Sequence, residues 1–121
     1  MILFSFEKLE VYQKSRKLVG KIYKLIEDFP PEERYALCDQ LRRSIISVPS
    51  NVAEESGRTS VKEKLHHLEY SYGSLMEAFC QLQIAMDLGY ISEEQLNSIR
   101  NDFIEVSKLL NGLSKSFRSK L

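Results

Sequence analysis

The segment Ser60–Leu88, SVKEKLHHLEYSYGSLMEAFCQLQIAMDL, has the most regular apolar pattern in the chain. Its apolar residues recur at alternating spacings of three and four, which places them on one face of an α-helix. The positions of this stripe are Val61, Leu65, Leu68, Tyr72, Leu75, Phe79, Leu82 and Met86. Ser60 and Glu63 have the spacing of a capping box, and Gly89 is suited to end a helix. The segment therefore predicts an amphipathic helix over residues 60–88.

The same spacing occurs before and after this segment. It predicts further helices near residues 7–28, 32–57 and 92–118, and no alternating pattern typical of a strand competes with it. Ser92-Glu93-Glu94-Gln95 matches the capping box at the start of the last helix. Because the loops between these helices are short, consecutive helices are expected to be antiparallel. The sequence therefore predicts one all-α domain over residues 1–121, an antiparallel up-down-up-down four-helix bundle.

Pro49 lies inside the second expected helix. A proline there removes one hydrogen bond and clashes with the carbonyl of Ile45, at a cost of about 3 kcal/mol. The helix is expected to be kinked at Pro49, and the alternative is that it breaks and restarts there. Either arrangement places nearby polar side chains beside freed backbone groups. The residues predicted to act at the kink or at an interface, with a ligand site as the alternative, are Ser47, Pro49, Asn51 and Glu54.

Composition excludes several classes of protein. The chain has 17 basic and 17 acidic residues in 121, so its formal net charge is zero. Its longest apolar run, Met1–Phe4, is far shorter than the roughly 20 residues that a membrane-spanning helix needs. The two cysteines, Cys38 and Cys80, are too few for a disulfide scaffold and are typical of a reducing compartment. We therefore expect a cytoplasmic protein without a membrane partner.

Basic residues are concentrated in two parts of this neutral chain. Lys14, Lys17 and Lys21 follow three-four spacing and form one stripe on the first expected helix. Lys115 and Arg118 lie near the end of the fourth, which adjoins the start of the first in an up-down-up-down bundle. Such a patch would bind the phosphates of a nucleic acid, and the alternative is an ordinary solvated helix face.

Arg42 and Arg43 are adjacent on the second expected helix. Two arginines together can bind a phosphate, but Arg42 can equally pair with Asp39. The full set of predicted nucleic-acid contacts is Lys14, Lys17, Lys21, Arg42, Arg43, Lys115 and Arg118.

No catalytic, metal or cofactor site is predicted. His66 and His67 are neighbours, so they point about 100° apart on a helix and do not chelate one ion together. Glu63-x-x-His66 has the spacing used in di-iron bundles, but those sites need a second such pair, which the sequence lacks. The chain also has no glycine-rich phosphate loop, so the sequence indicates a protein that is not an enzyme.

Several spaced motifs cover most of the chain, from Phe6 to about Leu110. They are Phe6-x-x-Leu9-x-Val11-Tyr12-Gln13, Phe29-Pro30-x-x-Glu33-Arg34-Tyr35-x-Leu37, Gln40-Leu41-Arg42-Arg43-Ser44, Ser47-Val48-Pro49-Ser50-Asn51-Val52-Ala53-Glu54, Gly73-Ser74-Leu75-x-Glu77, Gln81-Leu82 and Leu88-Gly89-Tyr90. In these motifs the chain resembles the small four-helix-bundle proteins encoded within intervening sequences of bacterial 23S ribosomal RNA genes, often labelled as ribosomal-protein-like. It departs from them at Tyr12, Glu55 and Phe79, where the family usually has tryptophan, glycine and an acidic residue.

The resemblance implies a bundle that assembles into a homo-oligomeric ring, usually a pentamer. It also implies a relation to the accessory proteins of diversity-generating retroelements, which bind both a reverse transcriptase and nucleic acid. Gly20, in the middle of the first expected helix, separately suggests a close helix approach, because glycine there costs about 1 kcal/mol relative to alanine.

Two functions are consistent with these observations. The preferred hypothesis is a non-catalytic homo-oligomeric scaffold that holds structured RNA through basic helix faces. The alternative is a protein-interaction adaptor ring without nucleic-acid affinity, whose partner would be a nucleic-acid-processing protein. The two differ in their salt dependence, since electrostatic RNA binding weakens steeply with salt.

Overall fold

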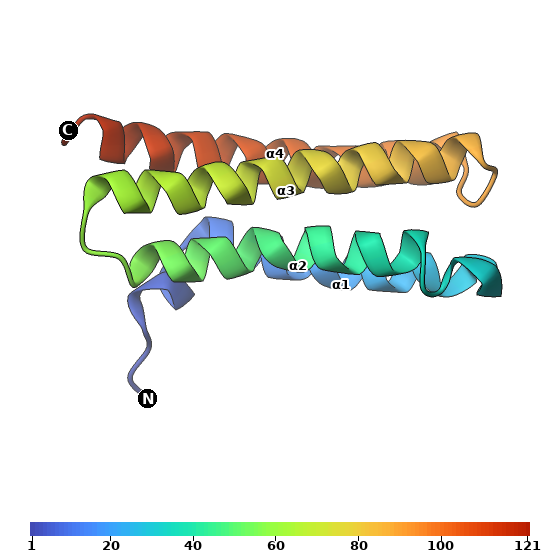
Figure 1. Cartoon of the computed structure of the whole chain (residues 1–121), viewed down its shortest axis with the longest axis horizontal. Helices are drawn as coiled ribbons and strands as arrows, with labels where there is room; N and C mark the ends of the chain where they lie inside the picture. The colour runs from blue at the N-terminus through green and yellow to red at the C-terminus, as the bar shows by residue number, and fades with distance from the viewer.

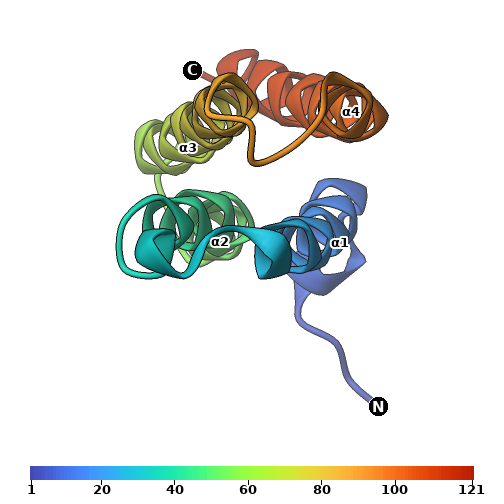
Figure 2. The ribbon, with the colours of Figure 1, turned by 90° about the vertical axis from the view of Figure 1, so that its right-hand side faces the viewer.

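The computed structural model describes residues 1–121 and is entirely helical. Its four α-helices are α1 (Glu10–Leu25), α2 (Leu37–Ser56), α3 (Val61–Asp87) and α4 (Glu93–Arg118). In Figure 1 each helix runs along the long axis in the direction opposite to the one before it. Figure 2 shows two layers, with α1 and α2 side by side beneath α4 and α3. The prediction of an all-α chain with four helices is confirmed.

The core lies between the two layers and is built from all four helices. In α3 the middle of the predicted stripe is fully buried, at Leu68, Leu75 and Leu82. Tyr72 and Phe79, on the flank of the same stripe, are only partly buried and pack against the core from its edge. The apolar stripe of α3 is thus wider than the surface that the other three helices cover, as is common for a helix in a globular protein.

The second helix begins five residues later than the predicted start near residue 32. Pro31–Glu33 form a short 3-10 helix instead, and Ala36 has a non-helical backbone (φ −117°, ψ −102°). The Glu33 carboxylate explains the later start, because it accepts a hydrogen bond from the Leu37 backbone N–H at 3.4 Å. Its second oxygen accepts one from the Tyr90 hydroxyl at 2.7 Å, which ties this turn to the α3–α4 connection.

The first helix is also shorter than predicted, beginning at Glu10 rather than near residue 7. Ser5–Lys8 form a 3-10 helix, and Leu9 is extended (φ −73°, ψ 130°). The Glu7 carboxylate accepts a hydrogen bond from the Phe4 backbone N–H at 2.7 Å, which stabilises this separate turn. At its other end α1 stops at Leu25 and continues as a 3-10 turn to Asp28.

Pro49 is inside α2, which continues through it from Leu37 to Ser56. The alternative that the helix breaks and restarts at this proline is therefore wrong, while the kink stays a prediction. Pro49 is buried, and so are Val48 and Val52 on either side of it. The packing of this apolar segment against the core offsets the hydrogen bond that proline removes.

Both predicted serine caps are present. Ser60 accepts a hydrogen bond from the Glu63 N–H at 3.1 Å, and Ser92 accepts one from the Gln95 N–H at 3.0 Å. Only Ser92 has the full reciprocal box, since the Gln95 side chain also accepts from the Ser92 N–H at 2.8 Å. Gly89 follows the end of α3 with a φ of +81°, the left-handed conformation expected of a helix cap.

The close helix approach expected at Gly20 is not found within the chain. Gly20 faces solvent, and a Cβ added to it would meet nothing within 4 Å. A helix that packed closely on Gly20 would have to come from another molecule.

Alanine substitutions should have opposite effects at Gly89, which has a positive φ, and at Gly20, which faces solvent inside a helix. We expect Gly89→Ala to lower the free energy of unfolding by about 1–2 kcal/mol, because an L-residue is strained at positive φ. Gly20→Ala is expected to raise it by up to about 1 kcal/mol, because alanine is the better helix former. Urea unfolding of both variants measures these changes. A destabilising Gly20→Ala would contradict the solvent-facing position and would instead indicate a packed contact there.

Candidate nucleic-acid interface

The net charge of zero is the sum of two oppositely charged ends. The α1–α2 and α3–α4 connections lie together at one end of the bundle (right-hand side of Figure 1). Residues 26–36 and 87–95 contain seven acidic side chains and one basic one. We call this group the acidic end; its acidic residues are Glu27, Asp28, Glu32, Glu33, Asp87, Glu93 and Glu94.

The opposite end holds the α2–α3 loop and the C-terminus (Figure 1). Residues 58–66 and 115–121 contain six basic side chains and one acidic one. Two of them meet at one ring, since the ammonium groups of Lys64 and Lys120 lie 5.5 and 5.4 Å from the ring centroid of Phe117. We call this group the basic end; its residues are Arg58, Lys62, Lys64, Lys115, Arg118 and Lys120.

The lysine stripe of α1 lies between these ends and faces acidic residues of α4. Lys14 pairs with Glu105 at 2.6 Å, and Lys21 pairs with Asp102 at 3.0 Å. The hydrogen bond to Glu105 raises the pKa of Lys14, so this ammonium stays charged and paired. Lys17 is exposed and makes no ion pair. Two of the three predicted α1 contacts are therefore already neutralised within the chain.

The structure does not bring Lys14 beside Lys115 and Arg118. Lys14 contacts Glu105, and Lys115 lies ten residues further along α4. At the rise of an α-helix, ten residues correspond to about 15 Å. Lys115 and Arg118 instead occupy the last turn of α4, at the basic end, where neither makes an ion pair.

Arg42 and Arg43 each contact a different partner within the chain. The Arg42 guanidinium donates a hydrogen bond to the Arg34 carbonyl at 2.8 Å, which holds the turn before α2. Asp39 pairs instead with Arg43, four residues later, at 3.7 Å. The alternative in which Arg42 pairs with Asp39 is therefore not found, and the two arginines lie nearer the acidic end than the basic one.

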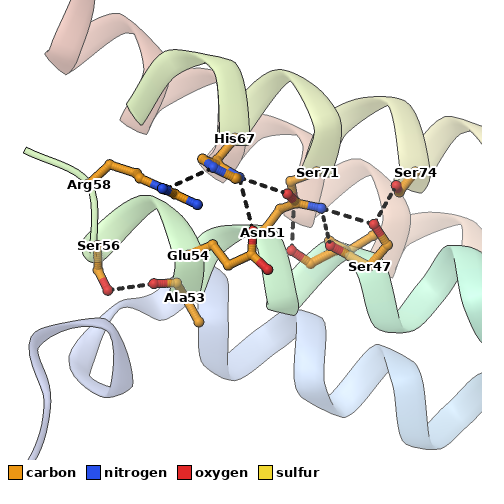
Figure 3. A network of polar contacts seen from close by, with 10 residues as sticks. Ser47, Asn51, Ala53, Glu54, Ser56, Arg58, His67, Ser71 and Ser74 are labelled. Carbon is orange, nitrogen blue, oxygen red and sulfur yellow. Dashed lines mark hydrogen bonds and ion pairs between the residues drawn. The ribbon is translucent and has the colours of Figure 1, made fainter. Parts of the chain in front are cut away.

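A network of polar side chains joins α2 to α3 near the basic end (Figure 3). His67 is at its centre: its Nε2 accepts a hydrogen bond from Arg58 Nε at 3.1 Å. Its Nδ1 lies 3.1 Å from Asn51 Oδ1 and 3.2 Å from Glu54 Oε2. Because the guanidinium only donates, Nε2 carries no hydrogen and Nδ1 is the donor. Both ring nitrogens of this buried imidazole are therefore engaged, by Arg58 on one side and by α2 on the other.

The same network continues along α2 through serines. The Asn51 amide donates to the carbonyl and the hydroxyl of Ser47, both at 2.9 Å. From α3, Ser74 donates to the Ser47 hydroxyl and Ser71 donates to the Val48 carbonyl, each at 2.8 Å (Figure 3). The structure thus places Ser47, Asn51 and Glu54, three of the four predicted kink or interface residues, along the α2–α3 contact, while Pro49 is buried in α2 and makes no contact in this network.

Sequence reasoning missed the α3 side of this network. In an antiparallel hairpin, residues at equal distances from the loop face each other, and the loop here is residues 57–60. Asn51 and His67 stand six and seven residues from it, but Ser47 and Ser74 stand ten and fourteen residues from it. Equal distance from the loop was therefore a usable signal for His67, but not for Ser74.

Glu55 is the most unusual ionisable group near the basic end. Only 4% of its side chain is exposed, and the ammonium of Lys64 lies 3.9 Å from its carboxylate. Lys64 also donates to the Glu55 backbone carbonyl at 3.2 Å. Burial raises the pKa of Glu55, and the nearby Lys64 charge only partly opposes this effect.

Two further observations describe the chain as a whole. No group of three or more histidine, cysteine, aspartate or glutamate side chains is arranged to hold a metal ion. None of the helices has the length and the hydropathy required to cross a bilayer.

Comparison with known proteins identifies the family. The model of the 23S rRNA-intervening sequence protein family matches residues 7–112, so the chain belongs to that family. It is also similar to a crystal structure from Bacteroides thetaiotaomicron VPI-5482, a protein of unknown function from the S23 ribosomal protein family. That similarity has a TM-score of 0.79 and 27% identity, and it covers 87% of this chain and 95% of the other. No curated protein sequence matches. The predicted family membership is confirmed.

The raised pKa of Glu55 leads to a pH-dependent effect on stability. The folded state favours the protonated carboxyl of Glu55. The stabilisation that comes from this preference is complete below the ordinary pKa of 4.5, and it is lost as the pH rises through the pKa that Glu55 has in the folded protein. We expect Glu55→Gln to raise the free energy of unfolding at neutral pH by on the order of 1 kcal/mol. The gain should shrink as the pH falls towards 4.5.

Chemical denaturation of both proteins across about pH 4 to 8 measures this difference. Glu77→Gln, which changes an exposed carboxylate on α3, is the matched control and should show no such trend. A gain for Glu55→Gln that is constant over the whole range would mean that folding leaves the Glu55 carboxyl unperturbed.

Proposed function

We propose that the protein is a non-catalytic, homo-oligomeric scaffold that associates with nucleic acid, specifically structured RNA, through its basic end. The observation that carries this proposal is the concentration of unpaired cations at one end of a chain with no net charge. Cations that are not paired within the protein can neutralise phosphates and release their counterions, which is the main source of sequence-independent affinity. Lys62, Lys115, Arg118 and Lys120 have no acidic partner to displace.

The other predicted contacts contribute less in this proposal. Lys14 and Lys21 would have to give up short ion pairs before they could bind a phosphate. Lys17 is free but lies between two paired lysines. Arg42 and Arg43 lie on α2 towards the acidic end, where the surrounding carboxylates oppose the approach of a phosphate chain.

Exposed apolar side chains support self-association. Met76 and Ile84 on α3 and Ile104 on α4 each leave more than two-fifths of their surface exposed. Met76 and Ile104 line a groove of about 180 Å³ between these helices, together with Phe79 and Phe103. Covering such side chains with a second copy removes apolar surface from water. A pentameric ring, as the family resemblance implies, would repeat the basic end around its axis and multiply its affinity.

A non-catalytic role is consistent with the state of the histidine. Both nitrogens of His67 are engaged by Arg58 and Asn51, and the ring is buried, so it is poorly placed to exchange protons with a substrate. Its contacts support a structural role in joining α2 to α3.

The apolar groove also favours a second candidate, an adaptor ring without nucleic-acid affinity that binds a nucleic-acid-processing protein. In that case the α3–α4 groove, rather than the basic end, would be the functional surface. The two candidates predict different responses to salt, since apolar contacts are weakened little by it.

Assembly and RNA association can be read in one experiment. Light scattering after size exclusion, with and without ribosomal RNA fragments, should give a mass that is a multiple of 14.1 kDa. The complex should co-elute with RNA at low salt and release it at high salt. A ring that ignores RNA at both salt concentrations would contradict the scaffold and support the adaptor. A monomer of 14.1 kDa would contradict both.

Charge reversal locates the surface. The triple variant Lys115→Glu, Arg118→Glu, Lys120→Glu is expected to lose most RNA affinity. The slope of log affinity against log salt concentration should also become shallower, by about one for each replaced residue that contacts a phosphate. The control reverses Lys24, Arg34 and Lys108, three exposed cations outside the basic end, and so makes an equal change in net charge. Fluorescence anisotropy with labelled RNA compares them, and equal losses in the two variants would show that only net charge matters.

A further inference from the structure

The first four residues form an apolar segment that the bundle leaves exposed. None of them has a charged side chain, and Ile2 and Phe4 leave 98% and 74% of their surface exposed. No backbone N–H of the chain donates a hydrogen bond to the carbonyls of Met1, Ile2 or Leu3. In Figure 2 the segment runs away from all four helices. We call Met1–Phe4 the apolar arm, and both its side chains and its carbonyls are available to a partner.

The base of the arm is held in place, so the arm has a defined direction. The Phe4 N–H donates a hydrogen bond to the Glu7 carboxylate at 2.7 Å, and the Phe4 ring stacks on Phe6, with centroids 6.1 Å apart. Phe6 in turn meets the ring of Tyr12 edge-on at 4.8 Å. The 3-10 turn Ser5–Lys8, which carries the arm, contacts α1 and α2. A segment with a fixed base loses less freedom on binding than a free tail does.

The groove between α3 and α4 has the size and the chemistry to take apolar side chains of such an arm. Its volume of about 180 Å³ is slightly larger than the roughly 150 Å³ of an apolar cavity that binds benzene. Met76 and Ile104 line it, together with the rings of Phe79 and Phe103, which are 5.1 Å apart. The one charged side chain in the lining is Arg100, which makes no ion pair. Its guanidinium lies 4.9 Å from the Phe79 ring and can donate to the carbonyls of the arm.

The arm cannot reach the groove of its own chain. A groove between two helices of one layer opens either to the core or to the outside, and the exposure of Met76 and Ile104 shows that this one opens outwards. The arm starts from the opposite layer, that of α1 and α2 (Figure 2). Four extended residues span at most about 14 Å. Passing around two layers of helices takes about 20 Å, since each is about 10 Å thick. Only the groove of another molecule is therefore accessible to the arm.

We infer that the apolar arm of one molecule binds in the α3–α4 groove of a second copy of this chain. This inference rests on the self-association in the proposed function and names the contact that produces it. The arm and the groove are different surfaces, so the contact is head-to-tail, and such contacts close into a ring when the rotation between neighbours allows it. Each copy then gives one arm and receives another.

The test measures mass by light scattering after size exclusion for two double variants. Ile2→Gln, Leu3→Gln changes the arm, and Met76→Gln, Ile104→Gln changes the groove. Net charge is unchanged and all four side chains are exposed, so circular dichroism should show the helix content of the parent protein. Each variant alone is expected to be a monomer of 14.1 kDa at concentrations at which the parent protein assembles. The loss of two buried apolar side chains weakens such a contact by about a hundredfold or more.

An equal mixture of the two variants gives the sharpest result. The arm variant keeps its groove and the groove variant keeps its arm, so one contact can still form between them. We expect a heterodimer with twice the mass of 14.1 kDa and no larger assembly, because the two remaining surfaces are both altered. The mixture is measured at higher concentration than the parent protein, since a single contact lacks the closure of a ring. A mixture that stays monomeric overturns the inference.

The control is Tyr35→Gln, Leu88→Gln, which changes two exposed apolar side chains at the acidic end. It should keep the mass of the parent assembly. If it dissociates as well, assembly depends on exposed apolar surface in general, and the inference is wrong. If either the arm variant or the groove variant keeps the parent mass, the inference is overturned while self-association stands. A monomeric parent protein overturns self-association and the arm contact together.

Discussion

The contact between α2 and α3 fixes the arrangement on which the remaining structure is built. Polar side chains cross this contact along its length, from Ser44 and Gln81, 2.8 Å apart, to Glu55 and Lys64 beside the loop. A buried polar group without a partner costs about 1–3 kcal/mol, so sliding one helix past the other would break several such bonds together. Every buried side-chain nitrogen and oxygen in the chain has a partner. Apolar packing makes the hairpin stable, and the polar contacts give it one register.

The second pair of helices depends on that hairpin. Only two ion pairs, Lys14–Glu105 and Lys21–Asp102, cross between α1 and α4, and both are partly exposed. Ion pairs at this level of exposure contribute little, so α1 and α4 are held mainly by the core between the layers. Because each helix runs opposite to the one before it, the path of the chain also sets where its charges lie. It brings the two acidic connections to one end and the basic loop and C-terminal turn to the other (Figure 1).

Local chemistry was sufficient to predict the helices, but long-range contacts set the details. The three-four spacing, the Ser60 and Ser92 caps and Gly89 are properties of short segments, and the structure has all of them. The late start of α2 depends on Glu33 and Tyr90, which are 57 residues apart in sequence. The neutralisation of Lys14 likewise depends on Glu105 in another helix. No pattern within one segment indicates such partners, and this is why the predicted basic stripe was only partly available for binding.

A neutral protein can still be an electrostatic binder when its charges are separated in space. At physiological salt the screening length is about 8 Å, shorter than these helices, so a phosphate at one end is hardly affected by charges at the other. The few free cations of one basic end would give weak binding alone. In the proposed ring the same end is repeated, and linked weak sites bind a long RNA far more tightly than any one of them. Self-association and a modest basic end are therefore complementary features of the proposed scaffold, since either one alone would hold RNA poorly.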